Sequence, residues 1–368
     1  MKRRSLTPTE RVDWLRLSRT SGGGPVTFAK LIERFETASR AIDALPDLSK
    51  RGGRAKPLKA IARDQAEDEL ADIENFGARL LCACEAEFPS DLAALDPPPP
   101  VITVKGPLLL SDKPVCAMVG ARNASAAAVK LARDFAAALA EAGFAVVSGL
   151  ARGIDGAAHE GALPHTIGVI ASGIDIAYPP QHADLQERIA SEGLLLAEQP
   201  PGTEPRGSHF PSRNRIIAGL AAGTLVVEAA VRSGSLITAR LAGEAGREVM
   251  AIPGSPLEPR SHGCNHLIRE GAVLVQSPEE VIELLTGFDG APRSTFRECG
   301  QEFAPPMSEE LAHAEPAAIA DRLTSAPVAV DELIRQSGES AAGVQLALLE
   351  LEIAGRLERH AGGRVSLR

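Results

Sequence analysis

The sequence contains few aromatic residues and no long apolar run. Ten Phe, one Trp and one Tyr make up only 3% of the 368 residues. This scarcity argues against a mechanism that needs many aromatic stacking platforms. No uninterrupted run approaches the roughly 18 apolar residues of a membrane-spanning helix, and the basic first residues lead into polar ones rather than into a signal-like apolar stretch. We therefore expect neither membrane spanning nor secretion.

Cysteine is also scarce. The five cysteines are an odd number and include one C-x-C pair, Cys82 and Cys84, but no C-x-x-C. This pattern indicates neither a disulfide framework nor a zinc ribbon. We expect a cytoplasmic protein without a metal site.

Several motifs of nucleotide chemistry and hydrolysis are absent. G-x-G-x-x-G does not follow the first apolar run of the central region, and no G-x-x-x-x-G-K-[ST] occurs. G-x-S-x-G and H-E-x-x-H are missing as well. The sequence therefore predicts no nucleotide cofactor, no P-loop NTPase and no zinc protease.

The net charge of −9 hides an uneven distribution. Residues 1–60 contain 14 Lys and Arg against 6 Asp and Glu, net +8, whereas residues 61–307 carry −13 and residues 308–368 carry −4. A basic segment is typical of a surface that faces a polyanion. A solvated basic face is the alternative, and both interpretations stay open.

The central region alternates short apolar runs with longer amphipathic stretches. The runs span 115–119, 145–148, 166–171, 194–197, 224–227, 248–252 and 273–275, and helix-like segments span 125–142, 181–191, 212–221 and 235–245. Parallel strands need crossover helices and are buried on both faces. The pattern therefore predicts an α/β domain with a doubly wound, mostly parallel sheet.

Smaller units flank this domain. Helical spacing of apolar residues within 11–48, interrupted by a glycine hairpin at 21–25, predicts a small helical domain. The tail shows three short helical patterns followed by a terminal β hairpin, which predicts a winged helix. We place the helical domain at 1–75, the α/β domain at 76–295, a linker at 296–307 and the winged-helix domain at 308–368.

Glycine, arginine and hydroxyl residues follow four of the apolar runs. Ligands of open α/β sheets bind beyond the carboxyl ends of the strands. Glycine lets backbone amides approach a ligand, and helix N-termini attract anions. These residues therefore predict a phosphate-binding ridge. They are Gly120, Arg122, Asn123 and Ser125, then Gly149, Arg152 and Gly153, then Ser172, Gly173 and Tyr178, and finally Arg232, Ser233, Gly234, Ser235 and Thr238.

A further basic segment lies between the fourth and fifth runs. Ser212 is expected to cap a helix whose first turn carries Arg213, Asn214 and Arg215. Two arginines at a helix start are electrostatically unfavourable unless an anion is bound there. Alternatively, the arginines pair with Glu198 or Glu228.

These motifs resemble the signature of the DNA-processing protein A (DprA, also called Smf) family. The matching runs are VGAR at 119–122, SGLARGID at 148–155, YP at 178–179, FPSRNRII at 210–217 and GSLITA at 234–239. The resemblance covers about residues 85–290. The first residues resemble the family's sterile-alpha-motif-like (SAM-like) helical domain, and the last 60 or so resemble its winged-helix tail.

The resemblance implies a non-enzymatic cytoplasmic protein that binds single-stranded DNA on an extended Rossmann-like domain. It further implies a homodimer that loads the RecA recombinase during natural transformation. Carried over motif by motif, the residues that would line the DNA pocket are Gly120, Arg122, Gly149, Arg152, Ser172, Gly173, Arg213 to Arg215 and Arg232 to Ser235. Ala121 stands where the family often has Ser or Thr, which puts one hydroxyl contact in doubt. Tyr178 and Phe210 are the aromatics at strand ends on which bases can stack.

Two other functions fit the sequence less well. A Rossmann-like nucleotide-processing hydrolase of the lysine-decarboxylase-like group carries P-G-G-x-G-T-x-x-E near 232–238, but here no Glu stands three residues after Ser235. A transcription regulator would act through its winged helix, yet residues 341–353 contain Glu350 and Glu352 and no basic residue. We expect Leu346 and Ile353 of this segment to face a protein partner.

Overall fold

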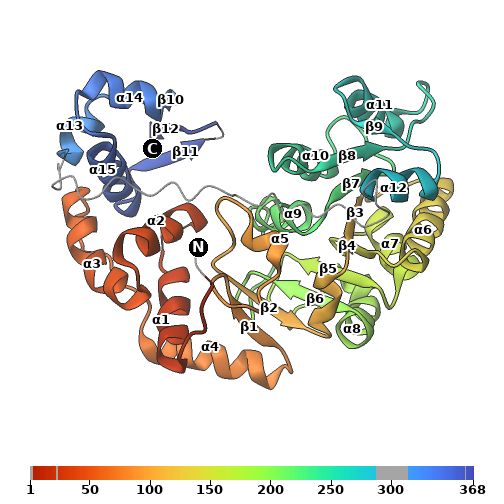
Figure 1. Cartoon of the computed structure of the whole chain (residues 1–368), viewed down its shortest axis with the longest axis horizontal. Coiled ribbons are helices and arrows are strands. Elements are labelled where there is room, and N and C mark those ends of the chain that lie inside the picture. Colours follow the sequence, from red (N-terminus) through yellow and green to blue (C-terminus); the bar gives the residue numbers. More distant parts are fainter. Residues whose placement is uncertain (1–2, 22–23, 287–313, 361) are drawn as a thin grey trace. The chain divides into compact units, whose positions relative to one another are not determined.

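The structure is a computed structural model that describes residues 3–21, 24–286, 314–360 and 362–368. It divides into two compact units (Figure 1). The first comprises Met1–Ser5 with Glu69–Arg297, and the second comprises Leu6–Asp68 with Glu298–Arg368. The helical and winged-helix regions, predicted as separate domains, therefore fall in one unit. The predicted linker at 296–307 lies outside the described residues.

The first unit is built on a nine-stranded sheet in the order β1-β2-β6-β5-β4-β3-β7-β8-β9. Its strands are β1 (Arg79–Cys82), β2 (Val101–Lys105), β3 (Val115–Val119), β4 (Ala145–Ser148), β5 (Thr166–Ile170), β6 (Leu194–Ala197), β7 (Gly223–Val226), β8 (Glu248–Ala251) and β9 (Val273–Leu274). The strands from β3 to β9 are parallel, while β1 and β2 pair antiparallel at one edge. The predicted doubly wound, mostly parallel sheet is confirmed.

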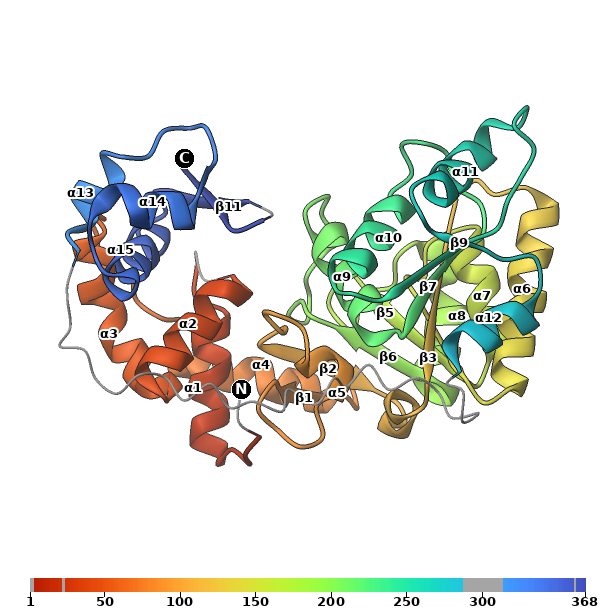
Figure 2. The same ribbon diagram turned by 45° about the horizontal axis from the view of Figure 1, so that its top comes forward.

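Helices cover both faces of this sheet (Figure 2). They are α5 (Ser90–Ala93), α6 (Ala126–Glu141), α7 (Ile154–Ala162), α8 (Ala183–Glu192), α9 (His209–Leu220), α10 (Ser235–Glu244), α11 (His262–Arg269) and α12 (Pro278–Leu285), with 3-10 turns at Leu108–Asp112, Pro180–His182 and Pro259–Ser261. Helix α4 (Arg63–Asn75) begins among the residues of the second unit and ends among those of the first. Buried residues of α6, α7 and α12, such as Phe135 and Leu139, form the core against β3, β4, β7 and β8. Their spacing of four residues places both side chains on the same helix face.

Helix α9 begins earlier than predicted. It starts at His209, after Ser208, so Ser212 is inside the helix and does not cap it. Pro211 explains the difference, because proline is tolerated in the first turn of a helix, where its missing N–H is not needed. The two arginines therefore lie beyond the first turn, so the predicted cap is wrong and the electrostatic argument for an anion at this helix start no longer applies.

The second unit contains α1 (Pro8–Ser18), α2 (Pro25–Phe35), α3 (Ala38–Arg51), α13 (Pro316–Ala320), β10 (Val328–Ala329), α14 (Val330–Ser337), α15 (Ala341–Ile353), β11 (Leu357–His360) and β12 (Arg364–Leu367). The last six form three helices and a small sheet in the order β10-β12-β11, which confirms the winged helix. Trp14 and Phe28 pack edge to face in the helical part, and their ring centroids are 5.0 Å apart. No helix in the described ranges is long and apolar enough to cross a membrane.

Candidate nucleic-acid site

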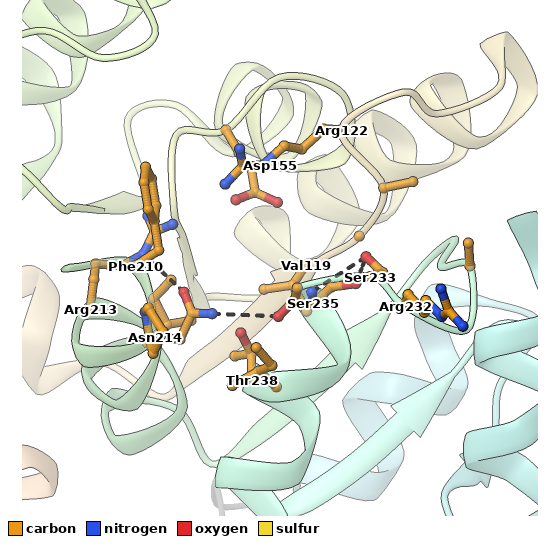
Figure 3. A pocket seen from close by; sticks show the side chains of 18 of the residues that line it. Val119, Arg122, Asp155, Phe210, Arg213, Asn214, Arg232, Ser233, Ser235 and Thr238 are labelled. Carbon is orange, nitrogen blue, oxygen red and sulfur yellow. Dashed lines mark hydrogen bonds between the residues drawn. The ribbon is translucent and has the colours of Figure 1, made fainter. Parts of the chain in front are cut away.

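The strand order of the sheet reverses beside β3. From there the chain runs through β4, β5 and β6 on one side and through β7, β8 and β9 on the other. In open α/β sheets such a reversal opens a crevice at the carboxyl ends of the strands. A cavity of about 580 Å³ lies there (Figure 3). Its walls come from the loops after β3, β4 and β7 and from the first turns of α9 and α10.

Most of the predicted site residues line this cavity or a second one of about 180 Å³. The larger cavity is lined by Gly120, Arg122, Asn123, Phe210, Arg213, Asn214, Arg232, Ser233, Gly234, Ser235 and Thr238. The smaller one is lined by Gly149, Arg152 and Tyr178, and again by Arg122, Phe210 and Arg213. The two cavities share these last three residues as lining and therefore adjoin each other, and we call the pair of cavities the strand-end groove.

An aromatic pair and a cation stand where the two cavities meet. The Arg122 guanidinium lies 5.1 Å from the centre of the Phe210 ring, within range of a cation–π interaction. The Tyr178 ring lies 5.8 Å from that of Phe210, and Tyr178 is 40% exposed. The groove therefore offers flat apolar surfaces directly beside a positive charge.

Arg213 forms the floor of the groove. Its side chain is 6% exposed, and Nη1 donates to the carbonyl oxygens of Gly149 and, at 2.6 Å, of Val169. Nε donates to Asn214 Oδ1 at 3.1 Å. Burial lowers the pKa of Arg213 to about 10, which the nearby Asp155 carboxylate opposes. Arg213 is thus still protonated at neutral pH, and it ties the end of β4 to β5.

Asp155 is a groove residue that the sequence analysis did not assign. It lies in the first turn of α7 and faces the larger cavity, with 6% of its surface exposed (Figure 3). Burial raises the pKa of its carboxyl, while Arg213 and the backbone amides of Ala151 and Gly149 lower it. The sequence feature that could have identified Asp155 is its position at the end of the SGLARGID run, directly after the glycines and the arginine that were predicted. Arg260, paired with Glu258 at 3.0 Å, was also not predicted.

Close packing requires glycine at two positions of the loop after β4, Gly149 and Gly153. A Cβ atom at Gly149 would lie 2.2 Å from Arg213 Nη1. At Gly153 a Cβ would lie 2.3 Å from the Ala121 carbonyl oxygen, and the φ of +78° also favours glycine. Gly153 is not among the lining residues. Both positions therefore shape the loop after β4, and a larger residue would displace it.

The loop after β4 also holds an unusual backbone conformation. Leu150 has a φ of +55°, which is rare for a residue with a side chain. Its N–H donates to His159 Nε2 at 3.3 Å, and its carbonyl oxygen lies 2.9 Å from His182 Nδ1. Burial lowers the pKa of His159 to about 3, so this imidazole is neutral and can accept the bond. Two histidines thus fix the loop that carries Arg152.

Four other predicted residues do not line the groove. Ser125 caps α6, and its N–H and Oγ both donate to Glu228, at 2.8 and 2.9 Å. Ser172 is buried and donates to the Ile176 carbonyl oxygen at 2.8 Å, and Gly173 packs beside it. Arg215 forms an ion pair with Glu198, which is the alternative that the sequence left open. These residues support the loops around the groove.

The described residues contain no group of three or more His, Cys, Asp or Glu side chains that could hold a metal ion. The groove instead combines aromatic rings, amides, hydroxyl groups and exposed arginines. This chemistry suits a ligand that has both flat rings and phosphates.

Family models match three regions of the chain. Residues 79–286, more than half of the chain, match the family described as DNA recombination-mediator protein A. Residues 8–71 match a DprA-like N-terminal HHH domain, and residues 303–363 match a DprA winged helix domain. The predicted family resemblance is confirmed over all three regions. The N-terminal helical domain, compared above with a SAM-like domain, carries the HHH description.

Individual proteins match over most of the chain. Protein Smf of Synechocystis is 31% identical over 98% of this chain and 99% of its own length. The crystal structure of DNA processing protein A from Streptococcus pneumoniae aligns with a TM-score of 0.65 at 36% identity, covering 77% of this chain and 98% of that one. A DNA processing protein A structure from Helicobacter pylori, described by its single-stranded DNA binding mode, aligns with a TM-score of 0.52 at 31% identity over 56% of this chain and 95% of that one.

Proposed function

Because the chain belongs to the DNA-processing protein A (DprA/Smf) family, we propose that it is a recombination mediator that binds single-stranded DNA in the strand-end groove. The observation that carries this proposal is the placement of Arg122 beside Phe210, with Tyr178 next to both, between two connected cavities. Unpaired bases expose faces that stack on aromatic rings, and the backbone that joins them is negatively charged. A base on Phe210 would bring its phosphates to Arg122.

Other parts of the groove suit the phosphates. Arg152 lines the smaller cavity and Arg232 lines the larger one, and both side chains are exposed. Helix α10 begins at the groove, and its positive dipole end would attract an anion. Its first N–H groups already have partners, since that of Ser235 donates to Ser233 Oγ at 3.4 Å and those of Leu236 and Ile237 donate to backbone carbonyl oxygens. These contacts read no base edges, so binding is expected to depend on salt more than on sequence.

We infer that the protein has no catalytic activity. Thr238 stands near the position where the hydrolase motif carries Glu, and it is 1% exposed. Glu228, the neighbouring acid, is engaged by Ser125. Asp155 is the carboxylate among the lining residues, and it faces Arg213. A hydrolase would need an acid free to activate water.

The family resemblance also supports a set of broader inferences. We infer that the protein works in the cytoplasm as a homodimer and delivers single strands to the RecA recombinase. Cys82, Cys84, Cys116 and Cys264 are buried and form no disulfide, which agrees with a reducing compartment.

Arg122→Ala tests the role of the groove in binding. We expect a weaker affinity for a single-stranded oligonucleotide and a salt dependence reduced by about 0.7 in the slope of log K against log salt, the amount for one lost phosphate contact. Arg188→Ala is the matched control, because Arg188 is also exposed but lies in the middle of α8, pairs with Glu192 and lines neither cavity. Fluorescence anisotropy at several salt concentrations measures both quantities.

Two outcomes would contradict the proposal. One is an unchanged slope and affinity for Arg122→Ala. The other is turnover of nucleotides by the wild-type protein that Asp155→Asn abolishes, which would support the hydrolase instead. Ser125→Ala provides a structural comparison, since loss of this cap should lower the free energy of unfolding by about 1 kcal/mol without changing the salt slope.

A further inference from the structure

Helix α15, the second helix of the helix-turn-helix in the tail, is buried on two faces. Val344, Leu348 and Leu351 pack in the core of the winged helix, as expected from their spacing. Leu346 and Ile353 are outside that cluster, yet they are only 5% and 1% exposed. The expectation that these two side chains face a separate partner is therefore wrong. Something within this unit of the chain covers them.

The covering surface comes from the N-terminal helical domain. Gln345 Oε1 on α15 accepts a hydrogen bond of 2.6 Å from Lys30 Nζ on α2. Gly52, which ends α3, lies so close to α15 that a Cβ atom there would be 2.0 Å from the Glu350 carbonyl oxygen and 2.8 Å from the Ala354 side chain. The backbones of α3 and α15 are therefore in direct contact, which only glycine permits at this point.

The ends of these two helices exchange arginines. Arg54, just after α3, donates to the carbonyl oxygen of Ile353 at 3.4 Å, and Arg356, just after α15, donates to that of Gly52 at 3.5 Å. The last carbonyls of a helix lack partners within the helix and carry partial negative charge. Each helix thus receives a positive charge from the other where its dipole is negative.

Charge complementarity extends beyond the helix ends. Arg51 lies 3.6 Å from Glu350, whose side chain is 2% exposed. Burial raises the pKa of Glu350, and nearby Arg51 and Arg34 lower it. The basic segment 1–60 and the acidic tail 308–368 have opposite net charges of +8 and −4. Several cations that could have faced a polyanion are used in this contact.

We propose that the second face of α15 is a docking surface for the chain's own N-terminal helical domain. The two domains then fold as one cooperative body, although about 300 residues separate the hydrogen-bonded partners Lys30 and Gln345 in the sequence. The docking also covers the helix that a winged-helix regulator inserts into the major groove of DNA. The partner of the tail is thus a segment of the same chain, independently of what the strand-end groove binds.

The single tryptophan provides a probe for this docking. Trp14 is buried in the helical domain, so its fluorescence reports the unfolding of that domain and not of the tail. In the full chain, Leu346→Ala is expected to lower the Trp14 unfolding midpoint by about 5 °C or more, because it removes contacts across the interface. Arg335→Ala, at an exposed position of the tail, is the control and should leave the midpoint unchanged.

A variant on the other side of the interface makes a second test. Gly52→Ser places a Cβ against the α15 backbone at a φ of −67° that any residue adopts, so it strains the docking and not the local backbone. Gly24→Ser is the matched control, since a Cβ there meets nothing within 4 Å and φ is −72°. We expect Gly52→Ser to lower the Trp14 midpoint and to increase binding of an apolar dye below that midpoint. An unchanged Trp14 midpoint in Leu346→Ala would overturn the proposal, whatever Gly52→Ser shows.

Discussion

Phe210→Ala is expected to weaken binding of single-stranded DNA by about 10- to 100-fold, since base stacking on an aromatic ring contributes about 1–3 kcal/mol per base. The ring lies where the two cavities of the groove meet and holds the Arg122 guanidinium against its face. Its loss removes a stacking surface and frees the cation. The slope of the salt dependence should change little, because no phosphate contact is removed directly.

The control for this variant is a phenylalanine outside the groove. Phe76 is 42% exposed at the end of α4 and is not among the groove residues. Phe76→Ala should bind single strands like the wild type, and Phe210→Tyr should retain most of the affinity because its ring can still stack. Equal binding by Phe210→Ala and wild type, with both proteins folded by circular dichroism, would show that bases do not stack there.

Arg213→Met should lower the free energy of unfolding by about 3–5 kcal/mol, as when one partner of a buried charge pair is removed. The substitution leaves the carbonyl oxygens of Gly149 and Val169 without their donor and Asp155 without its main counter-charge. Urea unfolding followed by circular dichroism measures this loss. DNA affinity should fall through distortion of the groove and not through a lost phosphate contact.

The stability deficit of Arg213→Met should depend on pH. Arg213 is the strongest influence holding down the pKa of the Asp155 carboxyl, which burial raises. Its removal raises that pKa further. A carboxyl with a folded-state pKa above its unfolded value contributes full stability below the unfolded pKa of about 3.9, and this contribution is lost as the pH rises toward the folded pKa. The deficit should therefore be smallest near pH 4 and grow toward neutral pH.

A double variant separates the charge effect from the lost hydrogen bonds. Arg213→Met with Asp155→Asn removes both charges, so it should recover part of the stability at neutral pH and lose the additional pH dependence. A deficit that is the same at pH 4 and pH 7 would mean that Asp155 and Arg213 are not coupled in the protein.

The fold was predictable where burial leaves a direct pattern in the sequence. Strands buried on both faces appear as short apolar runs, and the predicted run 115–119 coincides with β3. Strands β1 and β2 were not among the predicted runs, because they pair antiparallel outside the alternating βα pattern. The helical and winged-helix regions were recognised, but their joining in one unit depends on contacts between distant parts of the chain.

The sequence predicted which loops form the site, but not which of their residues are exposed to a ligand and which support the structure. Arg122 and Arg213 both lie in signature runs of the sequence, yet one is exposed and the other is 6% exposed and bound to backbone carbonyls. Only the tertiary structure decides which arginine can meet a ligand. Ser125 shows the same limit, because its N–H and Oγ both donate to Glu228, which is 103 residues away in the sequence.

Photo-cross-linking tests most directly whether single strands lie in the groove. A single-stranded oligonucleotide containing 5-iodouracil would be bound at low salt, irradiated and mapped by mass spectrometry of the cross-linked peptides. We predict cross-links at Phe210 and Tyr178, the aromatic residues of the groove, and their loss when unlabelled single strand, but not duplex, competes. Cross-links confined to residues 1–60 or to the winged helix, with none in the groove, would contradict the account.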